Sequence, residues 1–373
     1  ILDFVPVHFA VDYYGLAKYD GSALYEYPNN DVGISEWGSN NFMHSRGEVR
    51  SFLQSCANYW LRTFHFDGLR MDAISRIIYW HGDEKRGVNG NAVDFIKYMN
   101  QGLKDRNPGC FLAAEDSTNF ANVTKSVSEG GLGFDYKWDM GWMHDTLSYF
   151  QMSPDDRYNN YHKLTFSMMY YYNEKFLLPL SHDEVVHGKA TILQKMYGDY
   201  DIKFPQARAF YMYMMVHPGK KLNFMGNELG QFREWDEKRE QDFMLLDFPI
   251  HRAFNNYIAD LNKNYLSHPA FFGKEYDYDG FKWLDCNSPD RLMYSILRED
   301  NKSRIFAIFN FSKYEQIDYR IELPDNKGVN ILMNSDWKCY GGNADENNVF
   351  WHIDGNTLTC TMPRFSAALF ELK

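Results

Sequence analysis

Three short apolar runs of this chain end in carboxylate-bearing residues. Runs of about four to eight apolar residues are typical of buried strands in a parallel sheet. A carboxylate there is costly to bury unless it is paired. Carboxylates at the ends of successive parallel strands meet on one face, where barrel enzymes keep their catalytic groups. The pattern therefore predicts an enzyme. The three runs are Phe66–Asp72, which ends in Asp72, Phe111–Asp116, which contains Glu115, and Leu177–Glu184, which contains Asp183.

The carboxylates differ in their neighbours. Arg70 precedes Asp72 by two residues, so both side chains point to the same side of a strand. A fixed guanidinium keeps a carboxylate ionised and oriented, as a nucleophile requires. Glu115 follows an apolar stretch, and an apolar rim raises the pKa of a carboxyl toward that of a general acid. Taken singly, a structural ion pair explains Asp72 equally well, and an ordinary exposed Glu explains Glu115 slightly better.

The joint pattern fits glycosidic chemistry. Two carboxylates about 5–5.5 Å apart serve a retaining mechanism, one as nucleophile and one as acid/base. A third, here Asp183, would stabilise the positive charge that develops on the sugar. His182 precedes Asp183 without the spacing of a metal motif, so this pair and His8 are interpreted as ligands of sugar hydroxyls. The alternative for a lone histidine such as His8 is a hydrogen-bonded core residue.

Strand and helix patterns alternate through the first two thirds of the chain. Short strands separated by helices indicate βα units and a parallel sheet. From about residue 270 the helical stripes cease, and short strands separated by Asn, Asp, Gly and Pro predict an all-β module. The predicted strands of the first part are 1–8, 66–72, 111–116, 134–139, 177–184 and 221–228; its helices are 51–65, 91–106 and 205–217; the later strands are 292–297, 304–309, 319–323 and 367–372.

Composition bounds the domain count and the partners. The chain has 373 residues, of which 45% are hydrophobic, enough for a large barrel and a smaller module. We expect a catalytic barrel over 1–269 and a β-sandwich domain over 270–373. The net charge of −11 disfavours binding to nucleic acid or anionic membranes. A phosphate loop, a nucleotide fingerprint and a metal-ligand cluster are all lacking, so no cofactor or metal is predicted.

Cysteine usage and hydropathy predict a cytoplasmic location. Five scattered cysteines without a CxxC pair are typical of reduced thiols. No apolar stretch reaches transmembrane length, and no secretory signal precedes the first predicted strand. The sequence begins inside that strand without an initiator Met, which leaves the true amino terminus and any targeting segment open.

Four segments of the chain resemble the signature regions of the α-amylase superfamily of retaining glycoside hydrolases and transglycosylases. Longer segments make it most similar to the 1,4-α-glucan (glycogen/starch) branching enzymes. The four signature segments are Asp3–His8, Asp67–Asp72, Ala114–Ser117 and Leu180–Asp183, and the longer ones are Tyr19–Glu26, His182–Lys189 and Phe224–Gln231 with Glu234 and Trp235.

The resemblance implies a fold and a set of roles. The family's eight-stranded (β/α)8 TIM-type barrel would be entered here at about its third strand, so this α/β chain would lack the first strands and end in an all-β carboxy-terminal domain. Asp72 would be the nucleophile, Glu115 the general acid/base and Asp183 the transition-state stabiliser. The orienting and substrate-binding residues would be Arg70, His8 and His182, with Asp12 and Trp235 as further candidates for contacts along the substrate groove.

The implied reaction cleaves an α-1,4 bond of a glucan and transfers the released chain to a 6-hydroxyl, which makes an α-1,6 branch. One alternative is a hydrolytic relative, an amylase or debranching enzyme with the same three carboxylates. Another is an inactive glucan-binding fragment, since an open barrel exposes strand edges and an apolar interior. The intact Asp72, Glu115 and Asp183 argue against a decayed site.

Overall fold

The computed structural model describes residues 1–15 and 17–373. The chain divides into two compact units, one formed by residues 1–140 and 173–177 and the other by residues 141–172 and 178–373. Strand β7 (Phe176–Leu180) begins in the first unit and ends in the second.

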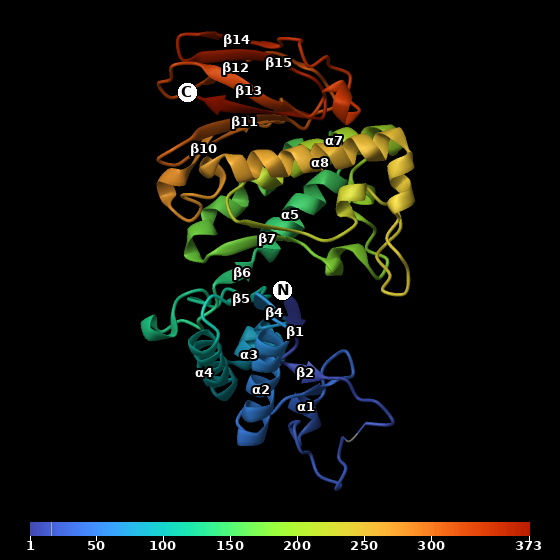
Figure 1. The fold of residues 1–373 in the computed structure, drawn as a ribbon, viewed down its shortest axis with the longest axis vertical. Coiled ribbons are helices and arrows are strands. Elements are labelled where there is room, and N and C mark those ends of the chain that lie inside the picture. The colour runs from blue at the N-terminus through green and yellow to red at the C-terminus, as the bar shows by residue number, and fades with distance from the viewer. Residues whose placement is uncertain (16) are drawn as a thin grey trace. The chain divides into compact units, whose positions relative to one another are not determined.

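The first unit contains a parallel sheet (Figure 1). Its strands pair in the order β1-β4-β5-β6, and β6 pairs with the start of β7. Gly68 permits the closest approach in this sheet, because a Cβ there would lie 2.4 Å from the carbonyl oxygen of Phe111. The predicted strands at 66–72, 111–116 and 134–139 are confirmed as β4 (Gly68–Met71), β5 (Phe111–Ala114) and β6 (Tyr136–Trp138), and the opening segment contributes β1 (Leu2–Phe4).

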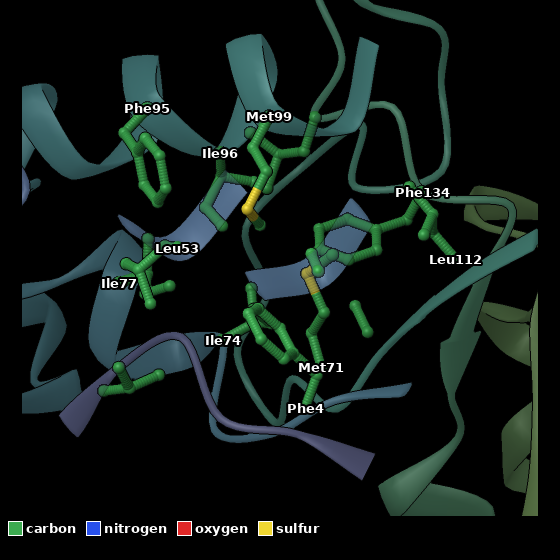
Figure 2. Packing of buried hydrophobic residues seen from close by; sticks show 14 of the residues in the cluster. Phe4, Leu53, Met71, Ile74, Ile77, Phe95, Ile96, Met99, Leu112 and Phe134 are labelled. Carbon is green, nitrogen blue, oxygen red and sulfur yellow. The ribbon is translucent and has the colours of Figure 1, made fainter. Parts of the chain in front are cut away.

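Helices cover this sheet with apolar faces. The helix α2 (Gly47–Thr63) buries Val49, Leu53, Ala57 and Leu61, which recur every four residues along one face. Figure 2 shows Leu53 packed in the same core as Phe95, Ile96 and Met99 of α4, together with Met71 and Leu112 of the sheet. The remaining elements of this unit are α1 (Asn30–Gly33), α3 (Ser75–Ile78), α4 (Gly90–Arg106), β2 (His8–Phe9) and β3 (Asn40–Asn41).

The opening segment differs from its prediction. A single strand over 1–8 was expected, but β1 ends at Phe4 and His8 belongs to β2, which pairs antiparallel with β3. Pro6 lies between them and lacks the N–H that would continue a ladder. His8 therefore reaches its position from a separate short hairpin and not from the end of a parallel strand.

The second unit contains the end of β7, which neighbours β8 (Lys220–Asn223). The helix α7 (Tyr200–Val216) starts five residues before its predicted beginning, so Pro205 lies inside it. Three helices of this unit were not predicted, α5 (Met140–Gln151), α6 (Ile192–Lys195) and α8 (Pro249–Ser267). No helix in the described part of the chain has both the length and the apolar character needed to cross a bilayer.

An all-β region follows α8, as predicted. Two antiparallel sheets, in the orders β13-β16-β11-β10-β9 and β12-β15-β14, share a core to which Phe306 and Phe370 of one sheet and Leu358 of the other contribute. The predicted boundary at residue 269 stays a prediction. The strands are β9 (Phe281–Ser288), β10 (Met293–Glu299), β11 (Arg304–Asn310), β12 (Gln316–Glu322), β13 (Val329–Asn334), β14 (Trp351–Asp354), β15 (Thr357–Met362) and β16 (Ser366–Leu372).

Three fully buried arginines join the helices of the second unit to its β-sheets. A guanidinium has five N–H donors and can satisfy several carbonyls at once. Each of these arginines donates across the boundary between helical and sheet segments, which ties both into one compact unit. The bonds run from Arg157 to the carbonyl of Phe311 at 2.9 Å, from Arg208 to Ser335 at 2.6 Å, and from Arg298 to Val216 at 2.9 Å.

Candidate active site

Strand register places Asp72 and Glu115 side by side. In the β4–β5 pair Met71 lies opposite Ala114, and each carboxylate follows directly after these last paired residues. The ladder continues one step further, because the N–H of Glu115 donates to the carbonyl of Met71 at 3.0 Å. Asp72 likewise donates its N–H to the carbonyl of Phe4 at 3.0 Å. Both side chains thus lie at the carboxyl edge of the sheet, as predicted.

A single guanidinium holds both carboxylates. Arg70 Nη1 lies 2.9 Å from Asp72 Oδ1, and Arg70 Nη2 lies 2.5 Å from Glu115 Oε2. Asp3 Oδ1 is 3.5 Å from Nη1, and the guanidinium carbon lies 4.3 Å from the ring centroid of Trp138. The Arg70 side chain is only 4% exposed. Fixed donors in a fork orient carboxylates more strictly than a point charge does.

Glu115 has the electrostatics of a general acid. Burial raises its pKa from 4.5 to about 7, against the opposing effect of Arg70. The charge of Asp72 and a hydrogen bond with it contribute to this rise in the pKa, while the N–H of Ala73, 3.2 Å from Oε2, opposes it. A group with a pKa near neutrality can both give and accept a proton under ordinary conditions.

Asp116, the residue after Glu115, forms a buried ion pair. Asp116 Oδ2 lies 2.9 Å from Lys137 Nζ, and the Asp116 side chain is fully buried. Lys137 also donates to the carbonyl of Thr118 at 2.7 Å, so it fixes the segment that leaves Glu115. Sequence reasoning missed this support; the signal was a lysine between two aromatic residues, Tyr136 and Trp138, in the predicted strand 134–139.

His8 lies in the first unit with its ring half-buried. Its Nδ1 is 2.7 Å from the hydroxyl of Ser39, and its ring centroid is 5.3 Å from that of Trp37. Burial lowers the pKa of His8, and the charge of Asp72 opposes that shift. A neutral imidazole beside Asp72 can exchange hydrogen bonds with a sugar hydroxyl.

Asp12 lies in an exposed loop of the first unit. With His8 it lines a cleft of about 640 Å³ whose other walls include Phe4, Phe42 and Phe52. Neither Asp72 nor Glu115 lines this cleft. Asp12 therefore shares this cleft with His8.

His182 and Asp183 lie in the second unit, just beyond the end of β7. They begin a short 3-10 turn, His182–Val185, in which His182 Nε2 is 3.3 Å from Asp183 Oδ1. The ring of Trp235 lies edge-on to that of His182, at 6.2 Å between centroids, and the N–H of Trp235 donates to the carbonyl of Val185 at 3.0 Å. The structure thus brings these three predicted residues together.

The predicted residues form two groups. Arg70, Asp72 and Glu115 make one cluster with His8 near it, and His182, Asp183 and Trp235 make another; Asp12 lies on the cleft. The meeting of Asp183 with Asp72 and Glu115 stays a prediction. Across the described residues no group of three or more His, Cys, Asp or Glu side chains is arranged to hold a metal ion.

Sequence comparison relates most of the chain to curated proteins. It is 42% identical over 350 residues to the 1,4-alpha-glucan branching enzyme GlgB of Bacillus cereus strain G9842, and equally to that of Bacillus thuringiensis subsp. konkukian. These matches cover 93% of this chain and 54% of each relative. The chain therefore spans about half the length of the curated relatives that it matches.

Solved structures and a family model agree on the fold. The chain superposes on the α-amylase of Geobacillus thermoleovorans with a TM-score of 0.67 and 16% identity, over 100% of this chain and 77% of the amylase. It superposes on a debranching enzyme of Nostoc punctiforme with a TM-score of 0.70 and 15% identity, over 100% and 75%. Residues 283–373 match the α-amylase carboxy-terminal all-β domain.

These findings confirm two sequence predictions. The fold is a partial TIM-type barrel followed by an all-β domain, as in the α-amylase structures. The resemblance to branching enzymes of the α-amylase superfamily is confirmed over most of the chain.

Proposed function

We propose that this chain carries the catalytic residues of a 1,4-α-glucan branching enzyme, a retaining transglycosylase. The observation that carries the proposal is the buried Arg70, which binds Asp72 and Glu115 at once while the pKa of Glu115 rises to about 7. One carboxylate is thereby oriented as a nucleophile and the other is able to carry a proton. The 42% identity to branching enzymes favours transfer over hydrolysis.

In the first step of the proposed reaction, Asp72 attacks the anomeric carbon of an α-1,4-linked glucose. Glu115 gives its proton to the glycosidic oxygen, the bond between that oxygen and the anomeric carbon breaks, and the leaving chain departs with a free 4-hydroxyl. The product is a glucosyl ester on Asp72.

In the second step, the 6-hydroxyl of another glucan chain attacks the same anomeric carbon. Glu115, now a carboxylate, takes the hydroxyl proton, and the ester bond to Asp72 breaks. Two inversions leave the α configuration, so an α-1,6 branch forms. Attack by water in place of the 6-hydroxyl would give hydrolysis.

The other predicted residues have supporting roles in this proposal. Asp183 would stabilise the oxocarbenium-like charge and, with His182, bind hydroxyls of the reacting glucose. His8 would contact the same sugar, and Asp12 and Trp235 would contact neighbouring glucose units. The partner is thus a neutral α-glucan, which an acidic protein does not repel.

Amylose treated with the full-length gene product tests the proposal. Branching predicts loss of the blue iodine colour with few new reducing ends. Abundant reducing sugar would instead establish a hydrolase of the amylase or debranching type. An unchanged colour would support the inactive glucan-binding alternative. The Glu115→Gln variant is the matched control, because it keeps the size of the side chain and removes its proton.

The proposed location is the cytoplasm. All five cysteines are free thiols in the structure, as expected of a reducing compartment. Fractionation of cells that express the full-length gene product, followed by immunoblotting, would test the location.

A further inference from the structure

The loop that follows Asp183 has an unusual backbone. Residues 184–190 include the end of the 3-10 turn, at Val185, and then pass through three left-handed conformations, at His187 (φ 59°), Gly188 (φ 78°) and Ala190 (φ 67°). Side chains other than glycine rarely adopt this region, so the surroundings must impose it. The loop begins at the residue after Asp183 and so continues directly from the segment that carries this carboxylate.

Lys195 binds the carbonyls of this loop. Its ammonium donates to three main-chain oxygens, those of Glu184, Lys189 and Ala190. An ammonium has three N–H donors, so the set is complete. The side chain is only 7% exposed, and α6 (Ile192–Lys195), whose amino end is closed by a capping box between Thr191 and Gln194, holds it in place. The cost of burying this charge lowers the pKa of Lys195.

Glu234 binds the amides of the same loop from a different segment. Its carboxylate accepts the N–H of Gly188 at 2.9 Å and that of Ala190 at 2.7 Å. These two bonds lower the pKa of Glu234 and keep it an acceptor. The next residue, Trp235, donates its N–H to Val185 and sets its ring edge-on to His182. The loop is therefore held between a cation on its carbonyls and an anion on its amides.

We propose that Lys195 and Glu234 are positioning residues, which hold the 184–190 loop so that Asp183 and His182 keep the orientation that catalysis needs. The inference rests on the proposed function for its catalytic part. The clamp, by which we mean the hold of Lys195 and Glu234 on residues 184–190, rests only on the five charge-assisted hydrogen bonds of these two side chains to the loop. Neither side chain contacts substrate in this proposal; both act through the backbone.

The test uses Lys195→Met, Glu234→Ala and Glu234→Gln in the full-length protein. We expect kcat to fall about 10- to 100-fold for Lys195→Met and Glu234→Ala, because small displacements of a catalytic group have effects of this order. KM should change by less than about threefold, since the lost interaction belongs to the transition state. Glu234→Gln keeps one acceptor oxygen and should be intermediate.

Amide hydrogen exchange supplies a second readout that does not depend on activity. Loss of the clamp should speed exchange of the amides of 185–190 at least about tenfold, because local opening becomes easier. The matched control is Lys221→Met. Lys221 also donates to two main-chain carbonyls, those of His217 and Gly219, but in another turn of the same unit. This variant should lower Tm while exchange in 185–190 and kcat stay at wild-type values.

Several outcomes would overturn the inference. If the amides of 185–190 exchange at the wild-type rate in Lys195→Met and Glu234→Ala, then these two side chains do not hold the loop. This conclusion does not depend on whether the wild type is active. If the amides of 185–190 exchange faster in these variants while kcat is unchanged, then Lys195 and Glu234 are not positioning residues for catalysis. Equal losses of kcat in Lys195→Met and Lys221→Met would assign the effect to general stability. A wild type without branching or hydrolytic activity would refute the proposed function and the positioning role, whereas the exchange data would still decide the clamp.

Discussion

The two candidate catalytic regions differ in what holds their carboxylates. In the first unit Asp72 and Glu115 are held through their side chains, by the two terminal nitrogens of Arg70. In the second unit the loop after Asp183 is held through its backbone, by the side chains of Lys195 and Glu234. The Asp183 side chain itself is 43% exposed.

The difference follows from the proposed roles. A proton-transferring pair needs two carboxyl groups close together and shielded from water, because burial and a like charge both raise the pKa of a carboxyl toward neutrality. A carboxylate that only stabilises charge needs orientation, which a rigid loop supplies without burial.

Removing the ionisable proton of Glu115 should have the largest effect on activity. Glu115→Gln should lower kcat by about 10²- to 10⁴-fold, as expected when a general acid is lost. Binding of a linear maltooligosaccharide, measured by calorimetry, should stay within about threefold of wild type, because the amide keeps the shape of the side chain. Turnover at the wild-type rate would exclude Glu115 as the acid/base.

Removing the guanidinium of Arg70, which Asp72 and Glu115 share, should have the second-largest effect on activity. Arg70→Met should lower kcat/KM about 100-fold, because both carboxylates lose their orienting partner. The same change should raise the pKa of Glu115, since Arg70 lowers it in the wild type. The alkaline limb of the pH–rate profile should therefore move to higher pH. Arg70→Lys, which keeps the charge but not the fork, should be intermediate; equal activity of all three proteins would contradict the model.

The fall of activity at alkaline pH should report the titration of Glu115. The first step needs its protonated form, so kcat/KM should fall above about pH 7, by about tenfold for each further pH unit. Steady-state rates measured from pH 5 to 9 would show this limb. The residual activity of Glu115→Gln should lack it, and a wild-type profile flat through pH 9 would contradict the assignment.

The free energy of unfolding should also depend on the titration of Glu115, with a smaller effect than the one on activity. The pKa of Glu115 is raised on folding from 4.5 to about 7, so the folded state binds more protons than the unfolded state in that window. The free energy of unfolding contributed by Glu115 is then fully present below pH 4.5 and is lost as pH rises toward 7. Denaturant titrations of wild type and Glu115→Gln at several pH values should diverge in this direction.

We expect the smallest effect on activity from a change at Trp235, which lies beside His182. Trp235→Phe keeps an aromatic edge against His182 but offers a smaller ring to a glucose unit. We expect KM to rise about threefold with kcat nearly unchanged, as for lost uniform binding. A large loss of kcat would instead place Trp235 in the positioning of His182.

A feature of the site can be predicted from the sequence when it depends on residues that are close together along the chain. Parallel strands that end in carboxylates are visible as apolar runs, so all six strands of the partial barrel and the positions of Asp72, Glu115 and Asp183 beyond them were predicted. His8 was placed on the wrong element, because Pro6 ended β1 at a point where the apolar pattern continued. The helices α5 and α8 were missed altogether.

The sequence by itself determined the types of the catalytic candidates and the order of the strands that carry them, because both depend on local patterns along the chain. The tertiary structure alone decided that Arg70 binds Asp72 and Glu115 together and that the pKa of Glu115 rises to about 7. It likewise decided that Lys195 and Glu234 meet on one loop. Burial and charge proximity depend on distances between residues far apart in the chain, which periodicity does not specify.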